Sequence, residues 1–228
     1  MIQEHAIEGS NFQYLTEFKE KLLNATSETM GKSLNNVHCE GLFSLVIAGK
    51  EHGKLLRVFI AHKKIKPAQI QYHTHRYPIR LTVLKGTVTD HVATWDQGNY
   101  NYKPESVAMD WFMYQSPLNG GKGLRFAGNR KYTLSDRAIP KGCSVNMAVE
   151  QFHTVSCSKG SIWIVEEQGF QVDHSFVLGT PFVTEGLYTE PLQFQTNDNW
   201  QLVIGALAEI LNSYQVLGMS DGYETEKS

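Results

Sequence analysis

The sequence predicts a mostly β protein, a sandwich or barrel, with one helix near each end of the chain. Many short apolar and β-branched runs are separated by turn residues, which is typical of sandwiches and barrels rather than of alternating βαβ units. The two stretches with helical periodicity lie near the two ends. At 228 residues and 41% hydrophobic content, the chain is long enough to bury the core of one large domain.

The first helix is predicted from a capping box and an apolar stripe. Ser10 is followed three residues later by Gln13, which together have the form of a capping box. Five apolar residues then recur at helical spacing on one face: Phe12, Leu15, Phe18, Leu22 and Leu23. We expect this helix to begin at Ser10 and to end at Gly31.

Strand signals begin after Val37. Five strands are expected before a long insertion, at residues 42–48, 55–61, 69–75, 79–84 and 87–95. Residues 49–54 read as a hairpin turn between the first two. Residues 96–131 are polar, aromatic and glycine-rich, and too long for a plain connection, so they either carry a hairpin of their own or form a flap over a site.

Further strands are expected after the insertion, at residues 132–139, 144–149, 153–156, 161–166 and 171–178. A second helix begins at Asp198 and ends at Gly218. Its apolar stripe consists of Trp200, Val203, Leu207, Ile210, Leu211 and Tyr214. This stripe packs either on the barrel or on a second subunit, and the polar tail of residues 219–228 is expected to be disordered.

Composition excludes several classes of protein. The 23 acidic and 21 basic residues give a net charge of −2 without a basic block, so no nucleic-acid partner is indicated and a small-molecule ligand is expected. The three cysteines include no C-x-x-C pair, which favours a reducing compartment. Neither a signal peptide nor a membrane-spanning run is visible, so we expect a cytoplasmic protein with no membrane partner.

Two histidines one residue apart indicate a metal site. In an extended strand His73 and His75 point to the same face, where both imidazoles can bind one metal ion. His153, from a distant strand, would complete a facial site. The alternative is that the pair simply lies on a polar strand face.

The spacing around these histidines resembles the first motif of the cupin superfamily. That motif has a glycine, five residues, H-x-H, three or four residues, a glutamate, six residues and a glycine. Here Pro67 stands in place of the opening glycine, His73 and His75 are in register, and Gly86 closes the motif. The resemblance implies a double-stranded β-helix, that is, a jelly-roll barrel.

The second cupin motif is represented by Gly142 and His153 at the usual spacing. Ala148 and Glu150 replace its usual proline and glycine, and Cys157 replaces its asparagine. The resemblance covers about 120 residues in one copy and leaves both helices outside. It implies a helical segment at residues 1–36, a cupin barrel at 37–190, and a helix with a polar tail at 191–228.

The glutamate of the first motif is missing. Counting back from Gly86 places Ile79 there, and the longer gap places Arg80 there. The remaining set of His73, His75 and His153 resembles the thiol dioxygenase branch of cupins. It implies a divalent metal, iron(II) first, with up to three open coordination positions. Imidazoles also suit zinc, nickel and copper, and manganese is a further alternative.

Four residues are candidates for substrate binding. Arg80 could clamp a carboxylate or phosphate, although strand alternation gives Ile79 the parity of the histidines. Gln71 shares the parity of His73, and Cys157 occupies the asparagine position. His91 either replaces the missing ligand, lies beside the metal ligands or lies on the surface.

The expected function is a metal-dependent cupin enzyme, an iron(II) dioxygenase-type oxidoreductase acting on a small polar substrate. Two alternatives remain open. One is a cupin isomerase or lyase acting on a sugar-like or carboxylate substrate. The other is a cupin that binds a small ligand without catalysis. Since cupins often dimerise, the resemblance also makes a homodimer possible.

Overall fold

The computed structural model describes residues 2–25, 33–34, 37–51, 54–67, 70–96, 106–115, 121–169, 172–179 and 197–220. Within these ranges the chain forms two long helices, α1 (Ile2–Leu23) and α3 (Asn197–Ser220). The strands are β1 (Leu42–Glu51), β2 (Lys54–Ala61), β3 (Ile79–Lys85), β4 (Val88–Trp95), β5 (Val107–Gln115), β6 (Gly123–Ile139), β7 (Ser144–Met147), β8 (Phe152–Cys157), β9 (Ile162–Glu167) and β10 (Ser175–Gly179).

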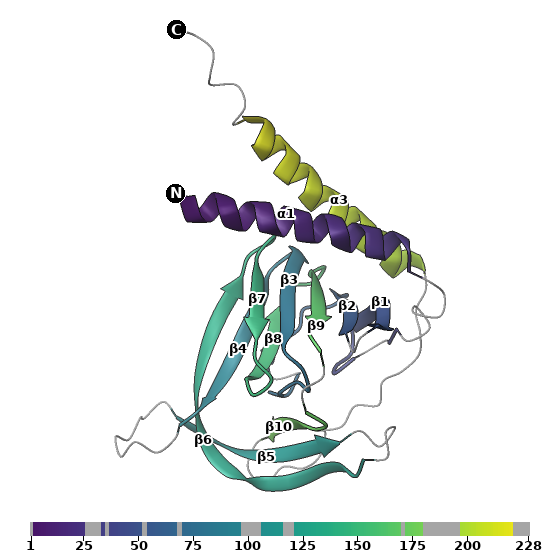
Figure 1. The fold of residues 1–228 in the computed structure, drawn as a ribbon. Coiled ribbons are helices and arrows are strands. Elements are labelled where there is room, and N and C mark those ends of the chain that lie inside the picture. The colour runs from purple at the N-terminus through teal and green to yellow at the C-terminus, as the bar shows by residue number, and fades with distance from the viewer. Residues whose placement is uncertain are drawn as a thin grey trace.

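These strands form two antiparallel sheets that together make a barrel (Figure 1). In the described part of the chain the first sheet has the order β1-β2-β9-β3-β7 and the second has the order β10-β5-β6-β4-β8. The two helices lie together at one side of the barrel, over the first sheet. This architecture confirms the predicted fold class, a jelly-roll barrel with a helix at each end.

The first sheet is apolar on both faces. On β2, Val58 and Ile60 pack against the helices, whereas Phe59 and Ala61 face the barrel interior. Side chains of a strand alternate between faces, so a strand that is covered on both sides reads as a nearly continuous apolar run. The place of β2 between two layers thus accounts for its nearly continuous apolar run.

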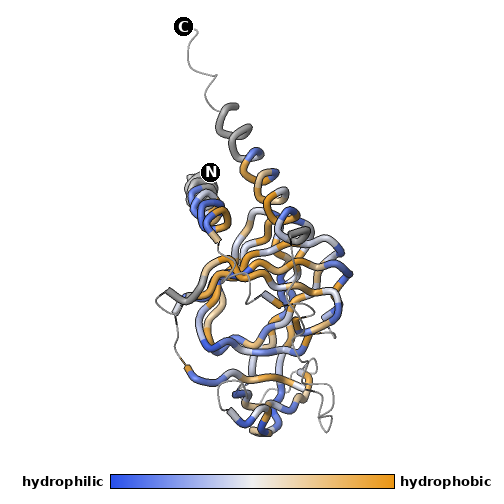
Figure 2. Tube along the Cα trace, turned by 90° about the vertical axis from the view of Figure 1, so that its right-hand side faces the viewer, coloured by the Kyte–Doolittle hydropathy of each residue, from blue (hydrophilic) through white to orange (hydrophobic). Residues whose placement is uncertain are grey.

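The helices bury the stripes that the sequence predicts. In α1 Leu15 and Phe18 are buried, and in α3 Val203 and Leu207 are buried in the same cluster as the outer face of the first sheet. Figure 2 shows the hydrophobic residues concentrated where the strands approach the helices. The stripe of α3 thus packs on its own barrel. Leu23, predicted to belong to the stripe of α1, is 64% exposed.

The predicted insertion contains a hairpin. β5 pairs antiparallel with the first half of β6, and the second half of β6 continues beside β4. The register shifts between Trp111 and Phe112, opposite Gly128. Gly128 has a φ of 146°, and a Cβ added there would lie 2.7 Å from Nε1 of Trp111. Such an irregularity bends a strand, and β6 curves from the barrel wall to its end (Figure 1).

Several predicted boundaries differ from the structure. α1 runs from Ile2 to Leu23, so it begins before Ser10 and ends before Gly31, and α3 continues past Gly218 to Ser220. β6 begins at Gly123, nine residues before the predicted strand, and β10 begins at Ser175 rather than at residue 171. Residues 70–75 form no strand, because their backbone bonds are divided between β8 and β10. Gly31 itself and residues 221–228 lie outside the described residues.

Among the helices that are described, none combines the length and the apolar character needed to span a bilayer.

We predict that Leu207→Ala will lower the free energy of unfolding by about 2–5 kcal/mol, because it leaves a cavity between α3 and the first sheet. Leu207 is 1% exposed, whereas Leu202 in the same helix is 44% exposed. Leu202→Ala is therefore the matched control and should change stability by less than about 0.5 kcal/mol. Urea unfolding followed by circular dichroism measures both, and equal effects would contradict the packing of α3 described above.

Candidate metal centre

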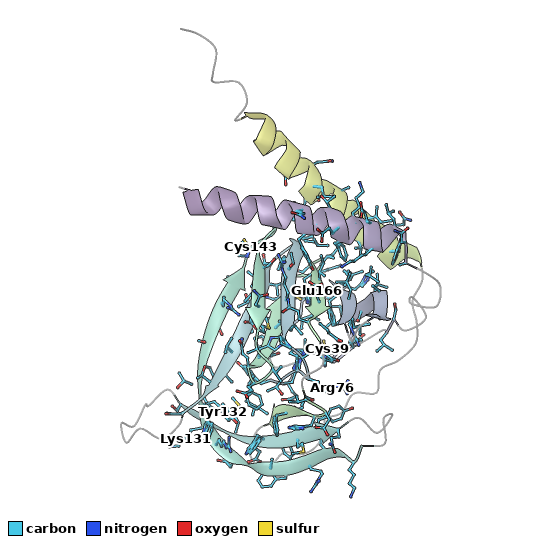
Figure 3. The ribbon with its side chains drawn as sticks, viewed as in Figure 1. Cys39, Arg76, Lys131, Tyr132, Cys143 and Glu166 are labelled. Atoms are coloured by element: carbon cyan, nitrogen blue, oxygen red, sulfur yellow. The ribbon has the colours of Figure 1, made fainter. Side chains whose placement is uncertain are left out.

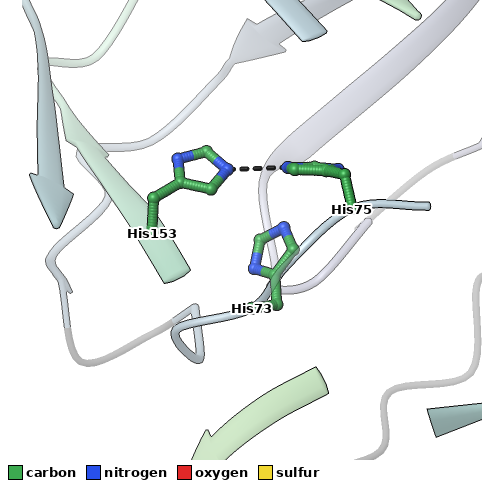
Figure 4. A group of neighbouring side chains, drawn as sticks. All are labelled: His73, His75 and His153. Carbon is green, nitrogen blue, oxygen red and sulfur yellow. Dashed lines mark hydrogen bonds between the residues drawn. The ribbon is translucent and has the colours of Figure 1, made fainter. Parts of the chain in front are cut away.

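Three imidazoles converge inside the barrel. One ring nitrogen from each of His73, His75 and His153 lies within 4.8 Å of the other two (Figure 4). His73 and His75 come from the segment before β3, and His153 comes from β8. In the part of the chain that is described, no cysteine or carboxylate joins this group. The structure thus brings together the three residues that the sequence selects.

Backbone pairing sets two of these histidines opposite each other. The His73 N–H donates to the carbonyl of His153 at 2.9 Å, and the His153 N–H donates back at 3.0 Å. Residues that exchange both bonds are directly paired, so their side chains stand on the same face as neighbours. Thr74 donates to the carbonyl of Phe176 in β10 at 2.8 Å, which ties the segment to the second strand beside it.

Hydrogen bonds to the other ring nitrogen fix the tautomers of two imidazoles. Nδ1 of His73 lies 2.9 Å from the backbone oxygen of Gln71, and a carbonyl only accepts, so Nδ1 carries the proton. Nδ1 of His153 lies 2.9 Å from Oδ1 of Asp90, and the same reasoning makes it a donor to the carboxylate. Both Nε2 atoms are left with a lone pair, which is the form that binds a metal.

The spacing of the Nε2 atoms suits a shared cation. Nε2 of His75 lies 2.7 Å from Nε2 of His153 (Figure 4). Two imidazoles that bind one metal at about 2.0–2.1 Å at a right angle have their nitrogens about 3 Å apart. The donor set and the spacing therefore fit a divalent transition metal.

Burial keeps the imidazoles of His73 and His75 neutral. Loss of solvation, followed by the neighbouring histidines, places the pKa of His73 well below its usual 6.5. The pKa of His75 is lowered well below 6.5 by the same causes in the same order, with a smaller effect of the Arg57 charge. A metal binds the neutral imidazole, so the interior favours the form that binds.

Asp90 is a part of the site that the sequence reasoning missed. Its carboxylate is fully buried; Oδ1 accepts from His153, and Oδ2 accepts from Arg137 at 2.7 Å. Burial alone would raise the pKa of Asp90, but the bonds from His153 and Arg137 outweigh it and the pKa is lowered. The signal was available, since Asp90 shares parity with the apolar Val88 and Val92 in β4, and a buried carboxylate needs a partner.

Arg80 does not lie beside the imidazoles. Its guanidinium carbon is 3.9 Å from the ring centroid of Tyr14 in α1. Its Nη2 donates a hydrogen bond to Oγ of Ser144 at 3.3 Å. The reason is strand alternation, because Ile79 and Leu81 face the interior and Arg80 between them faces the helices. In place of the predicted substrate clamp, Arg80 joins a helix to the sheet.

His91 faces away from the three histidines, because it follows Asp90 on β4 and neighbouring side chains alternate. Its Nδ1 lies 2.7 Å from Oδ1 of Asp136, and its Nε2 lies 2.7 Å from Oγ of Ser156. Gln71 contributes its backbone oxygen to His73, as described above. His91 therefore bonds to Asp136 and Ser156 instead of standing in for the missing ligand. Gln71 contacts the site through its backbone and not, as predicted, through its side chain.

Cys157 is buried in the interior cluster, away from the cavity beside His75. Burial raises the pKa of its thiol to about 11. The thiol therefore stays protonated and packed among apolar side chains, and the predicted contact with substrate does not appear in this arrangement.

Two charged residues inside the first sheet were also missed. Arg57 has the parity of Phe59, which faces the interior, and its Nε lies 3.8 Å from Oε1 of Glu167. Glu167 pairs in register with Ile79, the residue at the position of the missing cupin glutamate. An arginine within the apolar run of β2, at interior parity, was the signal for this pair.

A cavity of about 780 Å³ opens beside His75. Its wall includes Arg137, the partner of Asp90, and residues of the hairpin β5–β6. The insertion of residues 96–131 thus contributes to a wall of the cavity, with Trp111 and Arg130 among the lining residues.

No protein-family model matches the chain, and no curated protein matches it. Among solved structures, it is similar to the hydroxypropylphosphonic acid epoxidase from S. wedmorenis, at 14% identity and a TM-score of 0.34, over 60% of this chain and 55% of that one. It is also similar to hydroquinone 1,2-dioxygenase from Sphingomonas sp. TTNP3, at 11% identity and a TM-score of 0.31, over 66% of this chain and 73% of that one. A third similar structure is Cellulomonas parahominis L-ribose isomerase, at 13% identity and a TM-score of 0.37, over 82% of this chain and 95% of that one.

The chain spans less than two thirds of the length of the epoxidase structures. At these identities and TM-scores the likenesses carry no argument about activity. The family suggested by the histidine motifs therefore stays a prediction, supported by the fold and by the convergence of the three imidazoles.

We predict that Asp90→Asn will weaken metal binding by about 10- to 100-fold, because a neutral amide accepts the Nδ1–H bond of His153 less strongly than a carboxylate does. Asp136→Asn is the matched control, since it removes the carboxylate partner of His91 on the opposite face of the sheet. Competition with a chromophoric chelator measures the affinities. Equal affinities for the two variants would show that Asp90 does not support the metal site.

We predict that one thiol per chain reacts readily in the native protein. Cys143 is exposed, whereas Cys39 and Cys157 are buried and burial raises the pKa of each of these two thiols (Figure 3 labels Cys39 and Cys143). Because the thiolate is the reactive form, N-ethylmaleimide at neutral pH should label Cys143 alone, as read by peptide mass spectrometry. Labelling of all three in denaturant is the control, and rapid labelling of native Cys157 would contradict its burial.

Proposed function

We propose that this protein is a metal-dependent enzyme of the cupin type, in which His73, His75 and His153 hold iron(II) for an oxidation that uses O₂. The observation that carries the proposal is the convergence of three imidazoles, two of which have their Nε2 lone pairs set by bonds at Nδ1. Rings held in this way are prepared to bind a metal, because their orientation does not have to be established on binding.

The donor set supports an open metal. Ile79 occupies the position of the cupin glutamate, and within the described ranges the group contains the three histidines and no carboxylate. Three neutral ligands leave up to three positions in an octahedral shell, enough for a chelating substrate and O₂ together. A bound iron(II) would supply the redox chemistry that amino acid side chains lack.

Residues of the chain orient the histidine rings and exclude water from one side of them. Asp90 holds the ring of His153, and the backbone of Gln71 holds the ring of His73. The interior cluster, including Ile79 and Leu81, keeps one side of the imidazoles dry. The cavity beside His75 gives a substrate its approach. These features favour an enzyme over a barrel that only binds metal for stability.

We predict that the protein purified without chelator contains about one divalent metal ion per chain, and that His75→Ala weakens the binding by more than about 100-fold. Loss of a direct ligand should exceed the roughly 10- to 100-fold effect of a supporting residue. His62→Ala is the control, since His62 is exposed and is not one of the three. Elemental analysis and chelator competition give the readout. Equal and negligible metal in the wild type and His75→Ala would refute the site.

The same preparations test the reaction class. Iron(II)-loaded protein screened against metabolites should consume O₂ with a substrate, and His75→Ala should not. Turnover under nitrogen would instead identify an isomerase or lyase and would leave the metal site intact.

A further inference from the structure

The cavity beside His75 is larger than a small polar substrate requires. Its volume of about 780 Å³ lies in the range of about 300–1,000 Å³ that holds drug-sized ligands. His75 and Arg130 both line it, and they come from different elements, one at the metal site and one in the hairpin β5–β6. A molecule that fills this space therefore extends from the histidines to the hairpin.

Aromatic side chains form a continuous wall of the cavity. Trp111 contacts Phe176 with ring centroids 4.8 Å apart, and Phe176 lies 6.4 Å from Phe152. Phe152 in turn lies 5.6 Å from Tyr132 in an edge-to-face arrangement. All four residues line the cavity. Such a wall favours a flat, apolar ring system, because rings stack on it or meet its edges at little entropic cost.

One cation of the cavity wall, Arg130, is held between two aromatic rings. The guanidinium of Arg130 lies 3.9 Å from the ring centroid of Trp95 and 4.2 Å from that of Trp111, so it is enclosed between two indoles. Among the described residues Arg130 makes no ion pair with a carboxylate, whereas Arg137 is already bound to Asp90. The stacking covers the faces of the guanidinium and leaves its N–H edges for a carboxylate or another oxyanion.

Tyr132 adds a polar atom without a partner. The residue is fully buried, and its hydroxyl oxygen meets no hydrogen-bond partner within the part of the chain that the structure describes. It lies where β6 leaves the barrel wall (Figure 3). The hydroxyl itself is enclosed, so Tyr132 meets the cavity through its ring, as part of the aromatic wall.

We propose that this cavity binds an aromatic anion, a planar ring system that carries a carboxylate or a similar oxyanion, as the substrate of the metal site. The ring lies along the aromatic wall, the anionic group meets the edge of Arg130, and the other end reaches His75. This inference rests on the proposed function for the word substrate, but the binding itself does not need the metal.

Three probes test the proposal on chelator-treated, metal-free protein: 2-naphthoate, the uncharged 2-naphthamide, and cyclohexanecarboxylate, which keeps the charge without the ring. Calorimetric titration measures each affinity, and the fluorescence of the indoles at Trp95 and Trp111 reports occupancy. We expect 2-naphthoate to bind at least about 10-fold more tightly than either other probe, because only it uses both the wall and Arg130.

Variants assign the effect to the cavity. Arg130→Leu should remove the preference of 2-naphthoate over 2-naphthamide, and Arg130→Lys should keep only part of it, since lysine lacks the planar fork. Arg125→Leu is the matched control on the same strand, because Arg125 is exposed and does not line the cavity. It should leave the affinities unchanged.

Equal binding of 2-naphthoate and 2-naphthamide to the wild type, or no binding of 2-naphthoate at millimolar concentration, would overturn the proposal without any variant. An unchanged preference in a folded Arg130→Leu protein would overturn it as well. Because the protein is metal-free throughout, these outcomes are independent of whether it binds iron. Failure of the metal analysis would leave the aromatic-anion site standing as a binding site alone.

Discussion

The reciprocal backbone pairing of His73 with His153 is the contact on which the candidate site depends. It joins a segment without regular strand structure to β8, and the neighbouring bond from Thr74 joins the same segment to β10. Without this pairing the two halves of the site, separated by eighty residues of sequence, would have no fixed distance. Two ordinary amide hydrogen bonds therefore set the geometry of a metal centre.

Periodicity and motif spacing together predict most of the fold and the three histidines. Apolar runs broken by turn residues give the strands, and the stripes of Leu15 and Leu207 give the helices, because burial at fixed intervals is what a local pattern records. The same patterns misjudge residues 70–75. Their alternation is that of a strand, but a ladder needs a partner along its whole length, and here His73 forms only isolated bridges, to His153 and to Val177.

The residues that support the histidines could not be predicted from local pattern in the way that the histidines themselves were. Asp90 and Arg137 meet only because β4 and β6 are paired across an insertion whose length hides their register. Parity does carry information: it favours Ile79 over Arg80 for the interior, as the structure has it, and it points to Arg57 within β2. What parity cannot supply is which strand lies next to which, and therefore which charges become partners.

The two carboxylate oxygens of Asp90 accept hydrogen bonds from different parts of the protein. One accepts from a histidine of the metal site, and the other accepts from an arginine of the cavity wall. A single buried negative charge is thus shared between a histidine of the metal site and an arginine of the cavity wall. Whatever draws Arg137 away from Asp90 leaves more of that charge to His153 and makes its imidazole a stronger donor to a metal. By thermodynamic reciprocity, a metal that withdraws electron density from His153 alters how firmly Arg137 is held. The metal site and the cavity wall are in this sense coupled through one carboxylate.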